Sequence, residues 1–165
     1  MALSYTAAST RANPGPEEAR RPRTVVEITK QVEFSAAHRL WNPTFSDERN
    51  WEVFGICNNP AGHGHNYALD VTIAGEPDPE TGMIIDLKRL RDILDAVLIS
   101  QVDHKHLNHD VAFLQGVIPT VENLVISFWQ QLAGRLDGCT LSELVLYESR
   151  SNFARYRGPA EGSRG

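Results

Sequence analysis

The chain of 165 residues has only two cysteines, Cys57 and Cys139. Two cysteines cannot build the multi-bridge framework of a small secreted domain, so we expect a cytoplasmic, reducing location with Cys57 as a free thiol. The sequence also has no Cys-x-x-Cys pair to close a structural zinc site and no G-x-G-x-x-G dinucleotide fingerprint. These absences disfavour a disulfide scaffold, a zinc finger and a nicotinamide-dependent enzyme.

Long apolar runs and a large net charge are missing as well. No stretch approaches the ~20 apolar residues of a membrane helix, and the first residues lack the charged-then-apolar pattern of a secretion signal. The formal net charge is −5, so no broad basic surface for nucleic acid is expected. We therefore expect neither a membrane nor a nucleic-acid partner, and an anionic ligand would need local basic groups.

The patterned part of the chain indicates one domain at residues 24–158. With 41% hydrophobic residues the chain is long enough to bury a core. Residues 1–23 and 159–165 are small, polar and without periodicity, so we expect two disordered tails.

Alternating apolar and polar residues predict the strands of this domain. The expected strands are residues 25–38, 62–75, 144–148 and 153–156. Helical spacing of apolar residues predicts two amphipathic helices, one after Asp86 and one after Thr120, with these two residues as N-caps. The expected fold is α+β, a four-stranded and mainly antiparallel sheet with two helices on one face.

Three further segments complete this expectation. The turn residues at 77–82 predict a hairpin whose return strand begins at 83–85. The aromatic connector at 40–54 is expected to form an ordered loop or short helix over the site, because its large side chains need burial. The apolar positions of the second helix extend to Leu136, and Gly138 is expected just past its end.

Three histidines lie at the alternating positions that the apolar residues of the two long strands occupy. His38 continues the apolar set of 32–36, and His63 and His65 share the face of the apolar set of 67–73. Three nitrogen ligands without an obvious fourth are how a catalytic zinc ion is held, although iron or nickel would also accept such a set. The alternative is that these are hydrogen-bonded histidines at strand ends. The H-x-H pair with a third histidine at matching parity favours a metal.

Cys57 lies six residues before His63 in a loop rich in asparagine and glycine. A thiolate near a metal and a histidine is an activated nucleophile or base, whereas a buried cysteine is often only a small apolar residue. The loop composition favours the reactive thiol.

Asp103 and His104 form an adjacent acid and imidazole between the two helices. Such a pair can act as a proton relay, but a solvent-facing polar loop explains it equally well. His106 and His109 in the same loop are expected at the surface.

Glu148 follows an apolar strand, where a carboxylate needs a partner. A carboxylate can accept two parallel N–H bonds from a guanidine-like edge, such as that of a pterin or guanine ring. Thr120 and Glu122 at a helix N-terminus could add contacts to such a ring. The alternative for Glu148 is a salt bridge with Arg150 or Arg155 at the edge of the sheet.

Together these segments resemble the 6-pyruvoyl-tetrahydropterin synthase / 6-carboxytetrahydropterin synthase family. The matching blocks, in family order, are F-S-A-A-H-R-L, C-N-N-P-A-G-H-G-H-N-Y, D-P-E-T-G-M-I-I-D, V-D-H-K-H-L-N, P-T-V-E-N and V-L-Y-E-S. The resemblance covers about residues 25–158. It implies a tunnelling fold, in which trimers close their sheets into a barrel and two trimers stack into a homo-hexamer.

The resemblance also implies the roles of the site residues. It makes His38, His63 and His65 the ligands of one zinc ion per subunit, and Cys57 the group that abstracts a proton. The implied substrate is 7,8-dihydroneopterin triphosphate, which an internal rearrangement converts with loss of triphosphate.

The remaining roles are implied in the same way. Asp103 and His104 would be the family's relay pair, contributed by a neighbouring subunit. Glu148 would anchor the pterin ring, with Thr120 and Glu122 lining the pocket.

Two products fit this resemblance. The pyruvoyl enzymes of tetrahydrobiopterin synthesis have the long connector and the five residues between cysteine and histidine found here, whereas the carboxy enzymes of queuosine synthesis often have three. The loop therefore favours a lyase of the pyruvoyl type, with the carboxy type, which releases acetaldehyde, as the alternative. Ser149 stands where threonine is more usual. A non-catalytic pterin- or metal-binding module is a third possibility, which Cys57 argues against.

Overall fold

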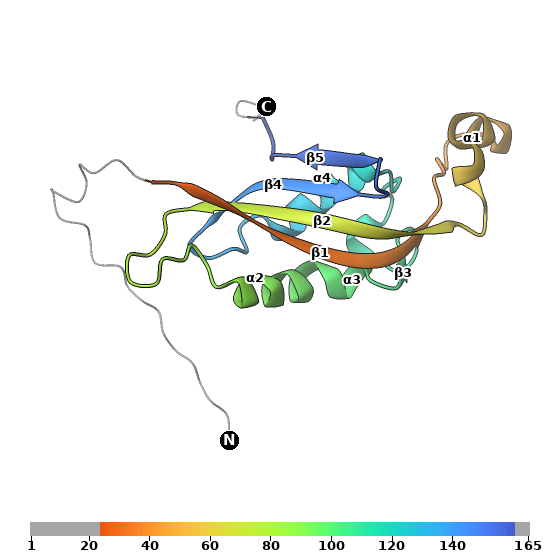
Figure 1. Cartoon of the computed structure of the whole chain (residues 1–165). Helices are drawn as coiled ribbons and strands as arrows, with labels where there is room; N and C mark the ends of the chain where they lie inside the picture. The colour runs from red at the N-terminus through yellow and green to blue at the C-terminus, as the bar shows by residue number, and fades with distance from the viewer. Residues whose placement is uncertain (1–23, 161–165) are drawn as a thin grey trace, which may run out of the picture.

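A single mixed sheet organises residues 24–160, the part of the chain described by this computed structural model (Figure 1). The strands are β1 (Val26–His38), β2 (His63–Gly75), β3 (Lys105–His106), β4 (Thr140–Tyr147) and β5 (Phe153–Tyr156), in the order β3-β1-β2-β4-β5. The pairs β1–β2, β2–β4 and β4–β5 are antiparallel, whereas β3 runs parallel to β1. The α+β prediction is confirmed, but the sheet has five strands and one parallel pair. The tails predicted at 1–23 and, for the most part, at 159–165 lie outside the described residues.

The two long strands follow from their alternating sequences. Their inward residues pack in the core, and Phe34 stacks on its register partner Tyr67 with ring centroids 4.8 Å apart. The pairing of β1 with β2 continues without a shift to the end of β1, so His38 lies directly opposite His63. The sequence pattern therefore decides which face each residue takes, and the register decides its neighbours.

Helices cover one face of the sheet (Figure 1). They are the continuous run of α2 (Leu87–Leu94), the π-helical turn η3 (Asp95–Ile99) and α3 (Ser100–Val102), followed by the short η4 (Ala112–Leu114) and by α4 (Val121–Leu132). Asp86 accepts a hydrogen bond from the Lys88 N–H at 2.8 Å, and Thr120 accepts one from the Asn123 N–H at 3.4 Å. Both predicted N-caps are therefore confirmed. The helices bury leucines and one phenylalanine against the sheet: Leu90, Leu94, Leu98, Leu124, Phe128 and Leu132.

The predicted return strand at 83–85 is wrong. The turn itself forms, because the Asp78 N–H donates to the Met83 carbonyl at 3.0 Å, but residues 83–85 take no strand conformation. The chain passes from this turn directly to the helix capped by Asp86, and residues 83–85 pair with none of the five strands. Ile85 packs into the core instead.

The second helix is shorter than its apolar pattern predicts. The α4 helix ends at Leu132, before Leu136 and Gly138. Gly134 has a φ of +76°, a conformation that favours glycine and commonly ends helices. Leu136 is still buried, so the apolar pattern continues although the helix does not.

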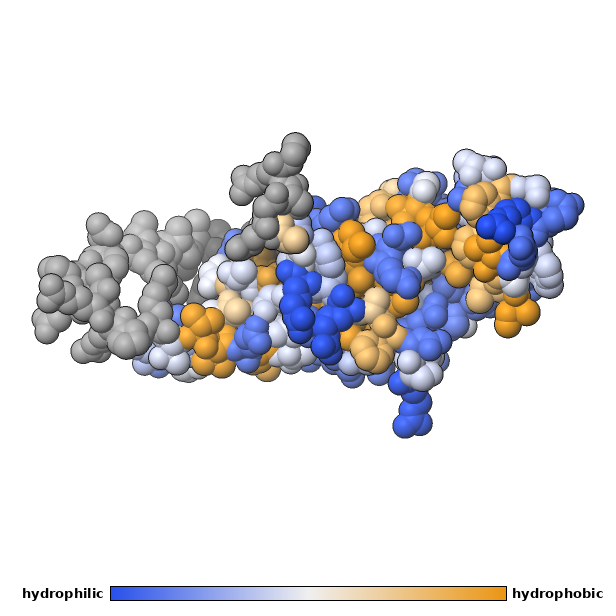
Figure 2. Space-filling view, turned by 90° about the horizontal axis from the view of Figure 1, so that it is seen from above, coloured by the Kyte–Doolittle hydropathy of each residue, from blue (hydrophilic) through white to orange (hydrophobic). Residues whose placement is uncertain are grey.

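The connector between β1 and β2 extends beyond the end of the sheet (Figure 1). It contains α1 (Asp47–Phe54), capped by Ser46, and the 3₁₀ turn η2 (Gly55–Asn58), so the predicted short helix is confirmed. Its large side chains are not buried as expected, since Trp51 is 59% and Ile56 is 83% exposed. Figure 2 shows hydrophobic surface at this end of the molecule. Among residues 24–160, no helix has the length and apolar character needed to cross a membrane.

Candidate functional site

Three imidazoles meet where β1 ends and β2 begins. His38 is the last residue of β1 and pairs with His63, the first residue of β2, while His65 lies two residues further on the same face. One nitrogen of each ring lies within 4.8 Å of the others. The structure therefore brings the three predicted histidines together, and they form a group that could hold a metal ion.

The protonation of His38 is fixed by its surroundings. Its side chain is buried, and Nδ1 lies 2.8 Å from the Pro119 carbonyl oxygen, which can only accept a hydrogen bond. Nδ1 is therefore the protonated nitrogen, and Nε2 turns its lone pair toward the cluster. Burial lowers the pKa of His38 to about 4, against the opposing effect of the Pro119 hydrogen bond and with a further lowering by the neighbouring imidazoles. His38 is thus neutral at physiological pH, with Nε2 available to a ligand.

Within the described part of the chain, the rings of His63 and His65 each keep one nitrogen unpaired, and Nε2 of His63 faces Nε2 of His38 within hydrogen-bond distance. Nδ1 of His63 and Nε2 of His65 are buried and have no hydrogen-bond partner among residues 24–160. Leaving such atoms unpaired costs about 1–3 kcal/mol each. Nε2 of His38 and Nε2 of His63 are 3.1 Å apart, close to the roughly 3.3 Å between two ligands of a tetrahedral ion with metal–nitrogen bonds of ~2.0–2.1 Å. The donor set therefore fits a divalent metal such as zinc.

Glu148 places a carboxylate beside this cluster. Its Oε1 lies 3.6 Å from Nε2 of His38 and 3.8 Å from Nε2 of His65. The alternative salt bridge with Arg155 is not formed, because Arg155 pairs with Glu143 at 3.4 Å. The Glu148 side chain is 20% exposed, so it can meet a ligand that enters next to the histidines.

Cys57 lies in η2, on the connector that leads into β2. Its side chain is half-buried, and its backbone carbonyl accepts a hydrogen bond from the Leu40 N–H at 2.9 Å. Within residues 24–160, the group of close metal-ligating atoms contains three histidines and no cysteine. The described structure therefore brings the three histidines together without the thiol of Cys57.

Asp103 and His104 contact each other. Nδ1 of His104 lies 2.9 Å from Oδ2 of Asp103, and the Ser35 N–H donates to Oδ1 of Asp103 at 2.9 Å. The hydrogen bond from Ser35, followed by the contact with His104, lowers the pKa of Asp103. A charged Asp103 therefore holds Nδ1–H of His104 and leaves its Nε2 free, on a side chain that is 83% exposed.

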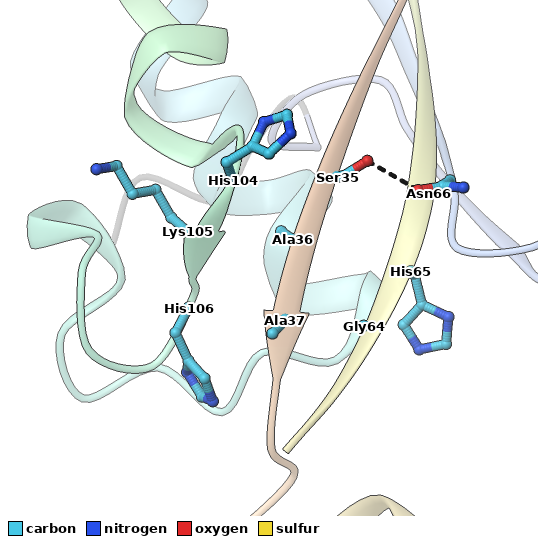
Figure 3. Close-up of a pocket in the computed structure, with 9 residues that line it drawn as sticks. All are labelled: Ser35, Ala36, Ala37, Gly64, His65, Asn66, His104, Lys105 and His106. Carbon is cyan, nitrogen blue, oxygen red and sulfur yellow. Dashed lines mark hydrogen bonds between the residues drawn. The ribbon is translucent and has the colours of Figure 1, made fainter. Parts of the chain in front are cut away.

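His104 has a left-handed backbone with φ of +56°, which non-glycine residues rarely adopt. Its ring leans toward β1 over a shallow depression of about 510 Å³, whereas the Lys105 side chain points away from β1 (Figure 3). His106 is half-buried rather than at the surface as expected, while His109 is exposed. The relay candidate is thus exposed, and it lines the same depression as His65 of the histidine cluster.

Thr120 and Glu122 stand at the N-terminus of α4. Thr120 is the N-cap, and Glu122 is exposed in the first turn. The carbonyl of the preceding residue, Pro119, accepts a hydrogen bond from His38, so this helix end contacts the histidine cluster through its backbone. Sequence reasoning missed this contact, since a backbone carbonyl leaves no signal in the sequence.

Tyr67 is a second residue that sequence reasoning did not identify. It is 1% exposed, and its hydroxyl lies 3.5 Å from Nδ1 of His38. Burial, with a smaller contribution from Glu148, raises the pKa of Tyr67, so the hydroxyl stays protonated. Its position two residues after His65 on the same face was the available signal.

Comparisons with known proteins agree on one family. The sequence profile of 6-pyruvoyl tetrahydropterin synthase matches residues 27–159. The 6-pyruvoyl tetrahydrobiopterin synthase of Poecilia reticulata is 43% identical over 131 residues, which are 79% of this chain and 89% of that protein. The 6-carboxy-5,6,7,8-tetrahydropterin synthase of Aquifex aeolicus is 28% identical over 160 residues, with 79% of this chain and 97% of that protein covered.

The fold agrees as well. The solved structure of Caenorhabditis elegans 6-pyruvoyl tetrahydropterin synthase matches with a TM-score of 0.79 and 37% identity, and the match covers 84% of this chain and 100% of that one. The family profile covers the sheet from the second residue of β1 onward and includes all of the site residues described above. This chain therefore belongs to the 6-pyruvoyl tetrahydropterin synthase family.

Proposed function

We propose that the protein is a zinc-dependent lyase that converts 7,8-dihydroneopterin triphosphate to 6-pyruvoyl-tetrahydropterin with release of triphosphate, and that it acts in the cytoplasm. The observation that carries this proposal is the convergence of three nitrogen ligands without a fourth protein ligand among the described residues. Such an open position is typical of catalytic rather than structural zinc.

The metal would be held by His38, His63 and His65. Zinc bound there supplies Lewis acidity, which lowers the pKa of the substrate's side-chain hydroxyls and of the neighbouring carbon. His38 supports this role by being neutral and by having its tautomer fixed by Pro119. No external oxidant or reductant is needed, because the side chain of the substrate is oxidised while its ring is reduced.

Cys57 would accept the proton from the substrate side chain. A thiolate is a suitable base, and this role is supported by the absence of Cys57 from the group of close metal-ligating atoms among the described residues. Asp103 and His104 would relay that proton, and the free Nε2 of His104 is the atom that exchanges it. Because the His104 side chain is 83% exposed, we propose that the pair serves the site of a neighbouring subunit.

Glu148 would anchor the pterin ring. Its carboxylate can accept two N–H bonds from the ring's guanidine-like edge, and it stands within 4 Å of two of the histidines. Thr120 and Glu122 would line the same pocket from the N-terminus of α4, which is tied to His38 through Pro119. The ring and the metal-binding side chain of the substrate would thus be held by adjoining segments.

The site would be completed by assembly into a hexamer of two stacked trimers whose sheets close into a barrel. Within residues 24–160, β3 pairs with β1 only at Ala36 and Ala37, so most of that edge of β1 has no strand beside it. An open strand edge pairs readily with another chain. Sedimentation of the purified protein would measure the mass, and a monomer would contradict the assembly.

One experiment tests the reaction. The zinc-loaded protein is incubated with 7,8-dihydroneopterin triphosphate, and triphosphate release and product mass are followed together. We expect triphosphate and 6-pyruvoyl-tetrahydropterin; metal retention without triphosphate release would instead indicate a non-catalytic pterin- or metal-binding module.

The alternative product is 6-carboxy-5,6,7,8-tetrahydropterin of the queuosine pathway, formed with acetaldehyde from the same substrate. The five residues between Cys57 and His63 support the pyruvoyl product, as does the higher identity to the pyruvoyl relative than to the carboxy relative. Acetaldehyde in the reaction mixture would decide for the carboxy type.

A further inference from the structure

Arg39 connects the metal centre to the cysteine loop. It directly follows His38, and its guanidinium holds Asn58, the residue after Cys57. Nε donates to the Asn58 carbonyl oxygen at 2.9 Å and to its Oδ1 at 3.1 Å, and Nη2 donates to Oδ1 at 2.9 Å. The next residue, Leu40, donates its N–H to the Cys57 carbonyl at 2.9 Å. Two consecutive residues after a metal ligand thus fix the backbone that follows the thiol.

Both the backbone and the guanidinium of Arg39 have further contacts. Asn108 pairs with both backbone groups of Arg39, accepting from its N–H at 2.8 Å and donating to its carbonyl at 2.9 Å. The guanidinium carbon lies 5.4 Å from the centre of the Trp41 ring, and Asn58 is only 6% exposed. The planar guanidinium of Arg39 therefore offers paired N–H donors in a fixed orientation, which the single ammonium group of lysine cannot reproduce.

We propose that Arg39 is a positioning residue that sets the distance between the Cys57 thiol and the metal centre, a role that rests on the proposed function of Cys57 as proton acceptor. The connector at 39–62 leaves the sheet at His38 and returns at His63. The contact of Arg39 with Asn58 ties the two ends of this connector together next to His38. Proton transfer depends on sub-ångström placement of the base, and a displacement of about 1 Å can cost roughly a hundredfold in rate.

The test compares Arg39→Lys and Asn58→Ala, which break the same contact from its two sides. Each should lower kcat about ten- to a hundredfold while KM stays within about twofold and the zinc content is unchanged. Arg49→Lys is the matched control, because Arg49 lies in the same connector but its exposed guanidinium pairs with Glu52 at 2.6 Å and lies 5.8 Å from the Phe45 ring centre, without a contact to Asn58. If Arg39→Lys does not fold, Asn58→Ala carries the same prediction.

The role through Cys57 is tested by combining substitutions. In a Cys57→Ala background, Arg39→Lys should cause no further loss of the residual turnover, because the group that it positions is gone. A full further loss of turnover in the double variant would overturn the proposal. So would a kcat of the single Arg39→Lys variant within twofold of the unsubstituted protein, or a loss of zinc together with activity in that variant.

A measurement without turnover separates this proposal from the proposed function. Iodoacetamide alkylation of each cysteine is followed by mass spectrometry in the zinc-loaded protein. Arg39→Lys and Asn58→Ala should alkylate Cys57 at least about threefold faster, as expected for a half-buried thiol on a released loop, while Cys139 in the same molecule keeps its rate. An unchanged Cys57 rate would refute the positioning role, whereas absence of turnover in the unsubstituted protein would refute only the proposed reaction.

Discussion

His38 should make the stability of the metal-free protein depend on pH between pH 8 and pH 5. Burial holds the pKa of His38 at about 4 in the folded protein, against 6.5 for a solvent-exposed imidazole. As the pH falls below 6.5, the unfolded chain takes up a proton at this position before the folded protein does. The contribution to the free energy of unfolding is therefore complete above pH 6.5 and is lost as the pH falls toward 4.

The magnitude follows from the two pKa values. Each tenfold difference in proton affinity corresponds to about 1.36 kcal/mol, so His38 alone should lower the free energy of unfolding by about 2 kcal/mol between pH 8 and pH 5. The lowered pKa values of His63 and His106, which also arise mainly from burial, act in the same direction. The total loss in the unsubstituted protein should therefore exceed the part due to His38.

The assay is urea unfolding in the presence of a chelator, followed by circular dichroism at pH 8 and at pH 5. His38→Gln should remove about 2 kcal/mol of the difference between the two pH values, because glutamine does not titrate in this range. The same difference in the variant and in the unsubstituted protein would refute the assignment of a buried, neutral His38. Loading with zinc should make the unsubstituted protein more stable at pH 8 and should not stabilise the variant to the same extent.

Three substitutions test the roles of the other site residues. His63→Ala should lose zinc and turnover together, measured by metal analysis and triphosphate release; activity with stoichiometric zinc would contradict its role as a ligand. Cys57→Ala should keep zinc and lose about 10²–10⁴-fold in kcat, as expected for a missing general base, and normal turnover would remove the thiol from the mechanism. Glu148→Ala should raise KM about ten- to a hundredfold through the loss of charge-assisted hydrogen bonds to the ring, and an unchanged KM would reject the anchor.

The parts of the fold that were predicted correctly depend on local patterns. The alternation of β1 and β2 is written in consecutive residues, and so are the caps at Asp86 and Thr120. The return strand at 83–85 was predicted from turn residues that do form a turn. The strand prediction failed because the helix that begins after Asp86 follows the turn directly.

The short strand β3 could not be predicted for a different reason. Its two residues lie in a polar segment without alternation, and they join the sheet because the backbone of 104–107 reaches Ser35 and Ala37. The His104 N–H donates to the Ser35 carbonyl at 2.6 Å, and the Leu107 N–H donates to the Ala37 carbonyl at 2.8 Å. Pairing of this kind depends on where α3 delivers the chain.

For the site, the sequence by itself determined the face on which each histidine lies, because side chains in a strand alternate and His38, His63 and His65 share the parity of buried residues. It also determined the residue types available for proton transfer. Only the tertiary structure decided that β1 and β2 pair in the register that sets His38 opposite His63 and that Glu148 stands beside them. It also decided that Pro119 orients the imidazole of His38 and that Arg39 holds Asn58 in the loop of Cys57. These contacts join segments far apart in the chain, and their geometry depends on packing and backbone position, which no local pattern encodes.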